Sequence, residues 1–497
     1  MILFRRIIQT IFLALFLLLL LYPEPVNSII PVNLFFISNP LLTISTIIAS
    51  RTFQMAFIAS AVIIILTIFL GRIFCGWLCP LGTTMDIFKK ITNPKYKNTS
   101  PGSPYLRQIK YFILLAIIIV AVFGVNIAGW LDPITIAFKG FALSLYPAMD
   151  YLLKGAFNAL GLKSFISPLN DIGILDTHSV LFHNSIIFFL ILVGILLAAF
   201  YQARFWCRHI CPLGALLALL SKWRFLNLIV GRHLCTECHR CQAVCKTDVF
   251  NEDFSLNDEE CIQCFACVKK CAKNGVSLGF TRDKSKRDSF LPARRGLLIA
   301  SGLSILSVPL LKRSFGLRLG PSLPRLRPPG VSHSEHRSDR DSEEEFLAKC
   351  QRCGECMKAC PTNGLQPLLG ESGLYAMFTP VLVPRIGNCR YSCNTCGQVC
   401  PSQAIPAMDL ADKQEWKIGR AYFDTTRCIP YVNKEHCLTC EEFCPVPEKA
   451  IEHYVKDGLE YPYVVKERCI GCGLCEKVCP VQGLAAIRVS PLKDAEL

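Results

Sequence analysis

Four long stretches of the chain lack charged residues and are predicted to form membrane-spanning helices. They are Ile7–Pro23, Thr52–Gly71, Tyr111–Leu131 and Thr177–Ala203. Each approaches or exceeds the ~20 residues that a helix needs to cross the hydrocarbon core of a bilayer. We therefore expect an α-helical membrane domain with four spans over residues 1–230.

The first stretch has a second interpretation, a cleaved secretory signal peptide. No convincing small-x-small cleavage site follows it, and Arg5 and Arg6 suit an anchor whose start stays in the cytoplasm. We predict an uncleaved anchor.

The segments between these stretches are also informative. Pro25–Ser50 is uncharged but interrupted by prolines and asparagines, which indicates an interfacial or re-entrant segment. Leu131–Asp176 is predicted to be a long loop, and its apolar part, Gly140–Met149, is too short to span a bilayer.

Loop charge predicts the orientation. Residues 72–110 carry seven Lys or Arg and a single acid, Asp86, whereas residues 132–176 carry three Lys and four Asp. Because basic loops stay on the cytoplasmic side, the start of the chain and the residues after 204 are expected in the cytoplasm.

The amino-acid composition includes an unusually large number of cysteines. The 497 residues are 52% apolar and 18% charged, with a net charge of +15 and 28 cysteines. In a membrane protein such a positive excess collects on cytoplasmic loops, so nucleic acid is not an expected partner. Twenty-four cysteines form six groups of four whose members are too closely spaced to pair as disulfides.

Two quartets follow the membrane domain and predict a cytoplasmic ferredoxin module at residues 231–290. Both have the spacing Cys-x2-Cys-x2-Cys-x3-Cys, the ligand spacing of bacterial ferredoxins with two [4Fe–4S] clusters, in which the fourth cysteine binds the neighbouring cluster. The alternative, zinc, uses two separated CxxC pairs instead. One cluster is assigned to Cys235, Cys238, Cys241 and Cys271, and the other to Cys261, Cys264, Cys267 and Cys245.

Four more quartets predict four further [4Fe–4S] clusters in a domain at residues 350–497, six in total. A proline follows each fourth cysteine and turns the chain away. Short helices and hairpins are expected here, in α+β domains like those of bacterial ferredoxins. The spacing does not assign the fourth cysteines to clusters, although duplication of a ferredoxin would give nested exchange, first quartet with last and second with third. The ligands are Cys350, Cys353, Cys356 and Cys360; Cys389, Cys393, Cys396 and Cys400; Cys428, Cys437, Cys440 and Cys444; and Cys469, Cys472, Cys475 and Cys479.

The remaining four cysteines form two CxxxCP motifs that end the second and fourth stretches. Cys75 and Cys79 form one motif, and Cys207 and Cys211 form the other. Cysteines at i and i+4 share a helical face, so the two pairs are predicted to converge at the cytoplasmic surface. A dithiol/disulfide relay, a metal site, an extra cluster and two structural turns ended by prolines all remain open.

Residues 1–290 resemble the NapH-type membrane subunits of quinol dehydrogenases and the related NosR-type membrane module. The resemblance consists of the four stretches, the paired CxxxCP motifs and the two-cluster tail. It implies that quinol is the electron donor, as in enzymes that serve periplasmic nitrate reductase.

Residues from about 325 to 490 resemble the NapG/MauM family of exported ferredoxin-type proteins. The matching motifs are Arg327-Pro328-Pro329-Gly330, Thr362–Pro367, Thr379–Arg385 and Cys393–Pro401. This resemblance implies electron delivery from a periplasmic domain to a periplasmic cytochrome or reductase.

Together the two resemblances imply that the chain is a fusion of two proteins. The residues that join the two parts, 291–349, can be compared with this interpretation. Arg294-Arg295 precedes sixteen uncharged residues, Gly296–Leu311, and looks like a twin-arginine export signal retained as a fifth span. The residues before the arginines match the usual consensus poorly, and Lys312, Arg313 and Arg318 place positive charge outside. A basic cytoplasmic linker with a helix on the membrane surface is the alternative.

The function predicted from these features is electron transfer from quinol in the lipid bilayer to a periplasmic reductase, as a component of a quinol dehydrogenase. Two alternatives remain, a quinol-independent conduit fed by a cytoplasmic ferredoxin or flavodoxin, and an accessory protein for metal reduction or cofactor maturation. No quinol site is located. His178, His183 and Asp132 are interpreted as polar interface residues, and His209 lies inside a CxxxCP motif.

Overall fold

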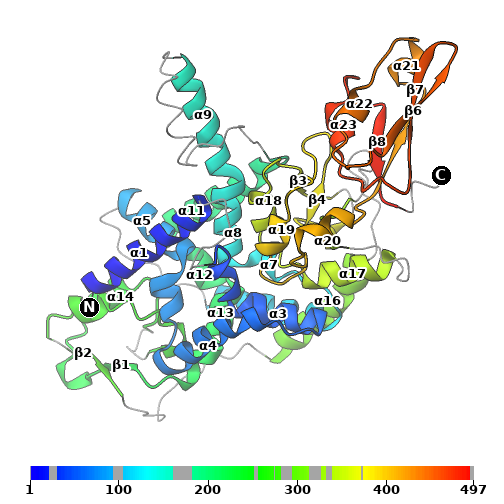
Figure 1. Ribbon diagram of the computed structural model, residues 1–497. Coiled ribbons are helices and arrows are strands. Elements are labelled where there is room, and N and C mark those ends of the chain that lie inside the picture. The colour runs from blue at the N-terminus through cyan, green and yellow to red at the C-terminus, as the bar shows by residue number, and fades with distance from the viewer. Residues whose placement is uncertain are drawn as a thin grey trace. The chain divides into compact units, whose positions relative to one another are not determined.

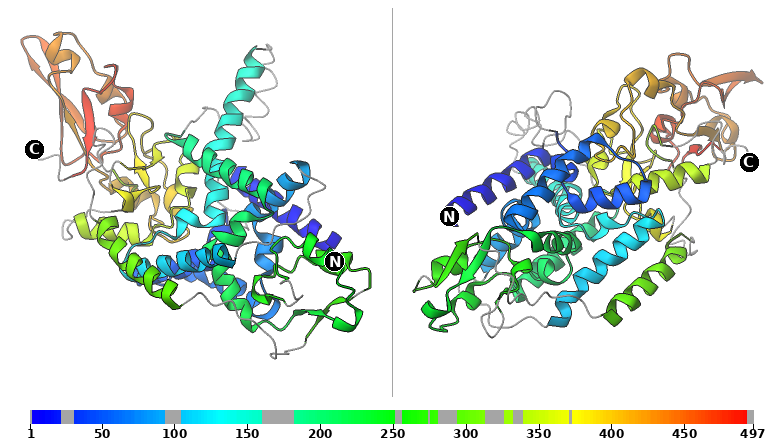
Figure 2. Two further views of the ribbon diagram at one scale, coloured as in Figure 1. Left: turned by 180° about the vertical axis from the view of Figure 1, so that it is seen from behind. Right: turned by 90° about the horizontal axis from the view of Figure 1, so that it is seen from below.

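The structure is a computed structural model, shown in Figures 1 and 2. It describes residues 2–21, 31–92, 104–159, 182–250, 256–273, 275–280, 294–312, 326–331, 339–370 and 373–492. The chain divides into two compact units, and each is described by itself. The first comprises residues 1–22, 34–146 and 186–308, and the second comprises residues 23–33, 147–185 and 309–497.

Helices occupy all four of the predicted membrane stretches. They are α1 (Ile2–Leu21), α4 (Ile58–Leu70), which the 3-10 turn η1 (Met55–Phe57) precedes, α6 (Pro104–Val122) and α11 (Ser185–Tyr201). Among the described residues, two helical segments are long and apolar enough to cross a membrane, Ile2–Leu21 and Arg295–Lys312. The second of these lies in α16 (Arg294–Lys312), the predicted fifth span, which includes Pro309.

The third stretch differs from its predicted bounds at both ends. Helix α6 begins at Pro104, seven residues early, and ends at Val122 instead of Leu131. Gly124 then adopts a φ of +78°, in the left-handed region that ends helices, and the short helix α7 (Ala128–Leu131) follows. Gly296 of α16 packs near α6, since a methyl group at Gly296 would lie 2.8 Å from the Phe112 ring.

The loop predicted for Leu131–Asp176 is wrong over its first part, which is helical from Pro133 to Ala159. The helix α8 (Pro133–Gly140), the π-turn η3 (Phe141–Leu145) and the helix α9 (Tyr146–Ala159) follow one another without a gap. The side chain of Asp132 caps α8 by accepting hydrogen bonds from two backbone N–H groups, and Pro133 occupies the first turn. The short apolar part therefore belongs to a longer helix with polar ends.

The interrupted segment before the second stretch forms two short helices, α2 (Leu34–Ile37) and α3 (Pro40–Ser50). The side chain of Asn39 accepts hydrogen bonds from the N–H groups of Leu41 and Leu42 and so caps α3. Asparagine and proline interrupt the apolar run here because they start a new helix.

The first unit also contains the predicted two-cluster module. Strand β1 (Asn227–Val230) pairs antiparallel with β2 (Val276–Gly279), and α14 (Arg240–Val244) and α15 (Ala266–Lys270) complete it. Leu228, Val249, Phe250 and Val276 form its small core with the cysteines. Three 3-10 turns also belong to this region, η5 (Ser221–Trp223), η6 (Arg232–Leu234) and η7 (Asp258–Glu260).

The second unit contains the distal cysteine domain, which consists of short elements as predicted. Its antiparallel strand pairs are β3 (Leu365–Pro367) with β4 (Pro380–Leu382), β5 (Arg420–Phe423) with β8 (Ile487–Ser490), and β6 (Ile451–Lys456) with β7 (Leu459–Val464). Asp457 and Gly458 have positive φ angles and form the tight turn of the β6–β7 hairpin.

The helices of this domain are short except for the first, α17. The domain's helical elements are α17 (Asp339–Lys349), α18 (Glu355–Lys358), η8 (Leu374–Ala376), α19 (Thr395–Gln398), α20 (Leu410–Glu415), α21 (Ile429–Val432), α22 (Thr439–Glu442) and α23 (Leu474–Val478).

Candidate iron–sulfur sites

All six quartets share one local structure around their third cysteine. That cysteine occupies the second position of a short helix in every case. The third cysteines are Cys241 in α14, Cys267 in α15, Cys356 in α18, Cys396 in α19, Cys440 in α22 and Cys475 in α23. A left-handed residue precedes four of these helices, namely His239, Phe265, Gly354 and Gly473. The second and third cysteines of each quartet are thus carried on a tight loop that enters a helical turn; the first lies on the same loop except in the third quartet, where Cys428 precedes a separate helix, α21.

The first unit brings the cysteines of the two-cluster module together as predicted. A cavity of about 450 Å³ is lined by the first three cysteines of one quartet and by Cys271, the fourth cysteine of the other. Cys245 in turn interacts electrostatically with Cys264 and Cys267 of the second quartet. The fourth cysteines are therefore exchanged between the two sites.

Three cavities in the distal domain assign the fourth cysteines that the sequence left open, and they contradict nested exchange. One, of about 350 Å³, is lined by the first three cysteines of the first quartet and by Cys400 of the second. Another, of about 400 Å³, is lined by the first three cysteines of the second quartet and by Cys360 of the first. The third, of about 340 Å³, is lined by the first three cysteines of the last quartet and by Cys444 of the third.

The fourth distal site, that of the third quartet, also includes a cysteine from the neighbouring quartet. Cys479 of the last quartet interacts electrostatically with Cys428 and Cys440 of the third. Exchange therefore occurs between quartets that are neighbours in the sequence, first with second and third with fourth. Pairing neighbours closes shorter loops than nesting the quartets does, so it costs less chain entropy.

The surroundings of these cysteines fit [4Fe–4S] clusters. Backbone N–H groups donate to cysteine sulfur in both units: Val249 to Cys245 at 3.3 Å, Gly275 to Cys271 at 3.2 Å, Ile405 to Cys400 at 3.4 Å and Ala421 to Cys469 at 3.4 Å. Such donors stabilise thiolates and set the reduction potential of a bound cluster. In the part of the chain that the structure describes, no three His, Cys, Asp or Glu side chains are placed to hold a single metal ion.

The two halves of the distal domain are joined at their cysteine loops. The N–H of Cys389, from the second quartet, donates to the carbonyl of Cys472, from the fourth quartet, at 2.8 Å. The four distal sites therefore form a series in which two exchanged pairs meet through a direct backbone hydrogen bond.

The CxxxCP motifs have a backbone that the sequence did not predict. Cys75 lies in the π-turn η2 (Phe74–Leu78), and the chain is extended at Cys79 before α5 (Pro80–Thr92). In the second motif, α12 (Phe205–His209) contains the first cysteine, and Cys211 caps α13 (Pro212–Leu220). The two cysteines of a motif therefore do not share one helical face, and the prolines begin the next helix instead of ending the previous one.

The two motifs nevertheless converge, as predicted. All four thiols are buried, with 3 to 7% of each residue exposed. Cys211 interacts electrostatically with the other three, Cys207, Cys75 and Cys79. Burial, opposed by Arg204 and reinforced by Cys75, raises the pKa of Cys207 to about 11, so as a free thiol it is protonated at neutral pH.

Each motif is preceded by an arginine that reaches the other motif. Arg72 lies three residues before Cys75, and its Nη2 atom is 2.9 Å from the position that a methyl group on Gly214 of the second motif would occupy. Arg204 lies three residues before Cys207, and its Nη1 atom donates to the carbonyl of Cys75 at 2.7 Å. The two repeats thus exchange arginines around the four thiols.

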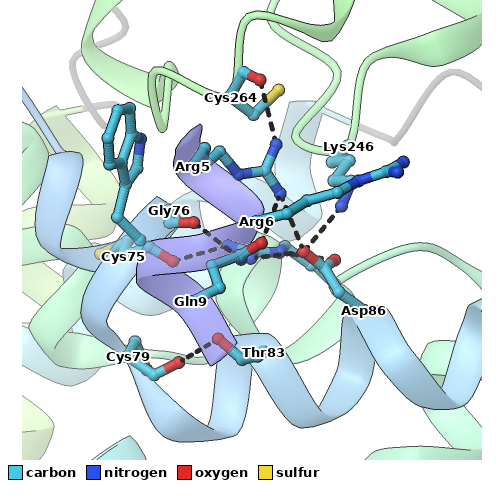
Figure 3. Close-up of polar contacts among 12 residues, drawn as sticks. Arg5, Arg6, Gln9, Cys75, Gly76, Cys79, Thr83, Asp86, Lys246 and Cys264 are labelled. Carbon is cyan, nitrogen blue, oxygen red and sulfur yellow. Dashed lines mark hydrogen bonds and ion pairs between the residues drawn. The ribbon is translucent and has the colours of Figure 1, made fainter. Parts of the chain in front are cut away.

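The carboxylate of Asp86 in α5 forms ion pairs with three cations beside the first motif, and Figure 3 shows those with Arg5 and Lys246. Its carboxylate lies 2.9 Å from Arg204, 2.6 Å from Lys246 and 3.3 Å from Arg5. Burial opposes ionisation of Asp86, but Arg204 and Lys246 outweigh it and hold the pKa well below its usual range.

Glu260, which directly precedes Cys261, is the corresponding carboxylate for the other arginine. It accepts hydrogen bonds from Arg72 at 2.7 Å, from Tyr111 at 2.7 Å and from Lys110. Burial raises the pKa of Glu260, but Lys110 and Arg72 prevail and lower it to about 2. The carboxylate is therefore charged at neutral pH.

The first motif packs directly on a loop of the two-cluster module. A methyl group at Gly76 would lie 2.1 Å from the carbonyl oxygen of Ile262, so only glycine fits there. Trp77 donates to the carbonyl of Gln263 at 3.0 Å, and Arg5 donates to that of Cys264 at 3.0 Å.

The second motif packs on the other loop that serves the same site. Arg208 Nε donates to the carbonyl of Lys246, next to Cys245, at 3.0 Å. Both motifs therefore contact the loops that carry the ligands of one cluster, that of Cys245 and Cys261.

The residues considered for proton transfer do not form a common site. Asp132 is buried and accepts a hydrogen bond from Asn39 at 2.7 Å besides capping α8, so it is a buried cap and not an interface residue. His209 is buried beside Gln202, at 2.9 Å. His178 lies outside the described residues. Sequence reasoning missed Arg72 and Arg204, although their identical spacing before both cysteine pairs was a visible signal.

The fold and these sites define an iron–sulfur electron-transfer protein. Residues 52–99 and 185–232 match a family described as a 4Fe–4S binding domain, and residues 346–366 and 462–484 match another family of the same description. Residues 227–272 match a 4Fe–4S dicluster domain.

Curated relatives agree with this class. The chain is 36% identical over 174 residues to the methylamine utilization ferredoxin-type protein MauM of Methylorubrum extorquens, which covers 33% of this chain and 72% of the relative. It is 34% identical over 181 residues to the ferredoxin-type protein NapG of Escherichia coli, covering 35% of this chain and 73% of the relative. The chain therefore belongs to the family of NapG- and MauM-type ferredoxin-type proteins.

A third relative extends the similarity to a larger share of the chain. An uncharacterised protein of Methanocaldococcus jannaschii is 24% identical over 236 residues, which cover 46% of this chain and 73% of that protein. No solved structure is significantly similar to this chain.

Proposed function

We propose that the chain oxidises quinol at a membrane domain and delivers the electrons to a periplasmic cytochrome or reductase. The observation that carries this proposal is the packing of both CxxxCP motifs on the loops that hold one cluster site. These motifs begin directly after α4 and α11, so two apolar helices end at an iron–sulfur site. Such a junction suits electron transfer out of a bilayer.

The proposed membrane domain consists of α1, α4, α6 and α11, with α16 as a fifth span. The length and apolar composition of α1 and α16 support it. So does the excess of basic residues in residues 72–110. In this arrangement the two-cluster module faces the cytoplasm of a bacterial inner membrane, and residues 326–492 face the periplasm.

The chemistry is a two-electron oxidation followed by single-electron transfers. Quinol becomes quinone, two protons are released to water, and two electrons leave one at a time. Bound [4Fe–4S] clusters supply the one-electron redox capacity, and the cysteine quartets would hold them. The chain itself positions these sites and provides N–H donors to Cys245, Cys271, Cys400 and Cys469.

Quinol-dependent reduction of the clusters is the expected result for the complete chain, purified without oxygen and reconstituted in lipid nanodiscs. Addition of a short-chain quinol should bleach the iron–sulfur absorption and produce electron paramagnetic resonance signals of reduced clusters. The same protein with oxidised quinone is the control. Reduction by ferredoxin or flavodoxin but not by quinol would contradict the proposal and favour a conduit fed from the cytoplasm.

A further inference from the structure

We propose that the two CxxxCP motifs together form one composite site that binds an additional iron–sulfur cluster through Cys75, Cys79, Cys207 and Cys211. The cluster is in addition to the six that the cysteine quartets predict. The inference does not depend on quinol as the donor, because it rests on the residues around the four thiols.

Neither repeat can provide such a site alone. Each of the two regions that match the 4Fe–4S binding domain, residues 52–99 and 185–232, contains a single CxxxCP motif with two cysteines. An iron–sulfur cluster with only protein thiolates requires four. The structure buries the two pairs side by side in one unit, so the two matched regions contribute halves of one site.

Buried charge around the thiols calls for an anionic occupant. Five cations in or beside the motifs have at most 4% of each residue exposed, namely Arg5, Arg72, Lys110, Arg204 and Arg208. Lys246 also pairs with Asp86, so these cations outnumber the two carboxylates that pair with them, those of Asp86 and Glu260. The positive excess suits an anionic occupant such as a cluster with four thiolates, whose net charge is about −2 in the oxidised state.

Neutral occupants leave this charge without compensation. Four protonated thiols or two disulfides carry no charge, so the excess of buried cations would persist in a dry environment. A single metal ion fits poorly too, because within the described ranges no group of three metal-binding side chains is placed to hold one.

An arginine with unused hydrogen-bond donors lies beside the second motif. Arg72 is fully buried, and its Nε and Nη2 atoms have no hydrogen-bond partner among the described residues. Its Nη2 atom and the sulfur of Cys211 lie 2.9 and 3.5 Å from the same point, the position of a methyl group on Gly214. The N–H of Gly214 also donates to that sulfur at 3.2 Å. Donors of this kind stabilise cluster thiolates.

The position of the composite site gives it a role. It lies between the ends of α4 and α11 on one side and the loops of Cys245 and Cys261 on the other, because Gly76 and Arg208 contact those loops. A cluster here would link the helical region of the first unit to the two-cluster module.

Iron content in cysteine variants of the complete chain tests the composite site. We expect Cys75→Ser and Cys207→Ser each to lose the same amount of iron, about two or about four atoms per chain for a [2Fe–2S] or a [4Fe–4S] cluster. The double variant should lose no more than either single variant, because both cysteines bind one cluster. Serine keeps the volume of the buried side chain. Cys245→Ser is the control, and its loss should add to that of Cys75→Ser.

A measurement on the unaltered chain keeps the test decisive if the variants do not fold. Mössbauer spectra of the ⁵⁷Fe-labelled protein should show more iron than the about 24 atoms of six cubanes. Iron that accounts for six cubanes and no more, with the four motif cysteines recovered as thiols or disulfides by alkylation and mass spectrometry, would overturn the proposal. Stoichiometric zinc or copper lost in both single variants would overturn it as well.

Discussion

Replacement of Cys400 by alanine is expected to abolish the cluster whose other ligands are Cys350, Cys353 and Cys356, although Cys400 belongs to a different quartet. The cavity that these four residues line provides the reason, since it brings the fourth cysteine of the second quartet to the first. Loss of one of the four ligands should remove the cluster, which iron analysis and electron paramagnetic resonance detect.

Double variants separate exchange between neighbouring quartets from nested exchange. Cys356→Ala combined with Cys400→Ala should cost the chain about four irons, no more than the larger single loss, because both residues serve one cluster. Cys396→Ala combined with Cys400→Ala should cost about eight. Nested exchange would cost about eight irons in both double variants, and quartets that each bind their own cluster would give the two losses in reverse order. Either result would contradict the exchange between neighbouring quartets.

Alanine at Gly76 is expected to detach the first CxxxCP motif from the two-cluster module. The added methyl group would lie 2.1 Å from the carbonyl of Ile262, a backbone atom that cannot move without shifting the loop between Cys261 and Cys264. Overpacking of this kind costs about 1–3 kcal/mol. We expect a lower midpoint of thermal unfolding in detergent, together with partial loss of the cluster of Cys261.

Gly194→Ala in α11 is the matched control, because nothing lies within 4 Å of the position of its methyl group. Alanine also favours a helix over glycine by up to about 1 kcal/mol. An equal effect of both substitutions on iron content, or no effect of Gly76→Ala, would show that the motif and the cluster loop are not in contact.

The sequence predicted the cluster ligands because their chemistry is local. Three thiols within seven residues can only surround something small, and the position of Cys241 or Cys475 in a short helix follows from that spacing. The exchange of Cys245 and Cys271 was predictable from the ferredoxin pattern for the same reason.

Contacts between residues far apart in the sequence were not predictable in the same way. Which fourth cysteine serves which distal quartet depends on how the loops close, which the cysteine spacing does not specify. Nested exchange would close longer loops at a greater cost in chain entropy. The helix from Pro133 to Ala159 was missed because its apolar part was judged by length alone, without the cap that Asp132 provides.

The arginines around the CxxxCP thiols illustrate a third limit. Arg72 and Arg204 appeared in the sequence as loop charges that set membrane orientation, yet both are almost fully buried. Their partners, Glu260 and Asp86, lie 188 and 118 residues away in the chain, so no local pattern could have paired them.

Metal analysis of the complete chain, prepared without oxygen, tests the central claim most directly. If the cysteine quartets hold iron–sulfur clusters that carry electrons, the protein should contain at least about 24 irons per chain with matching acid-labile sulfide, and dithionite should reduce several distinct centres. Zinc in place of iron, or spectra with no signals from multiple cubane centres, would contradict it.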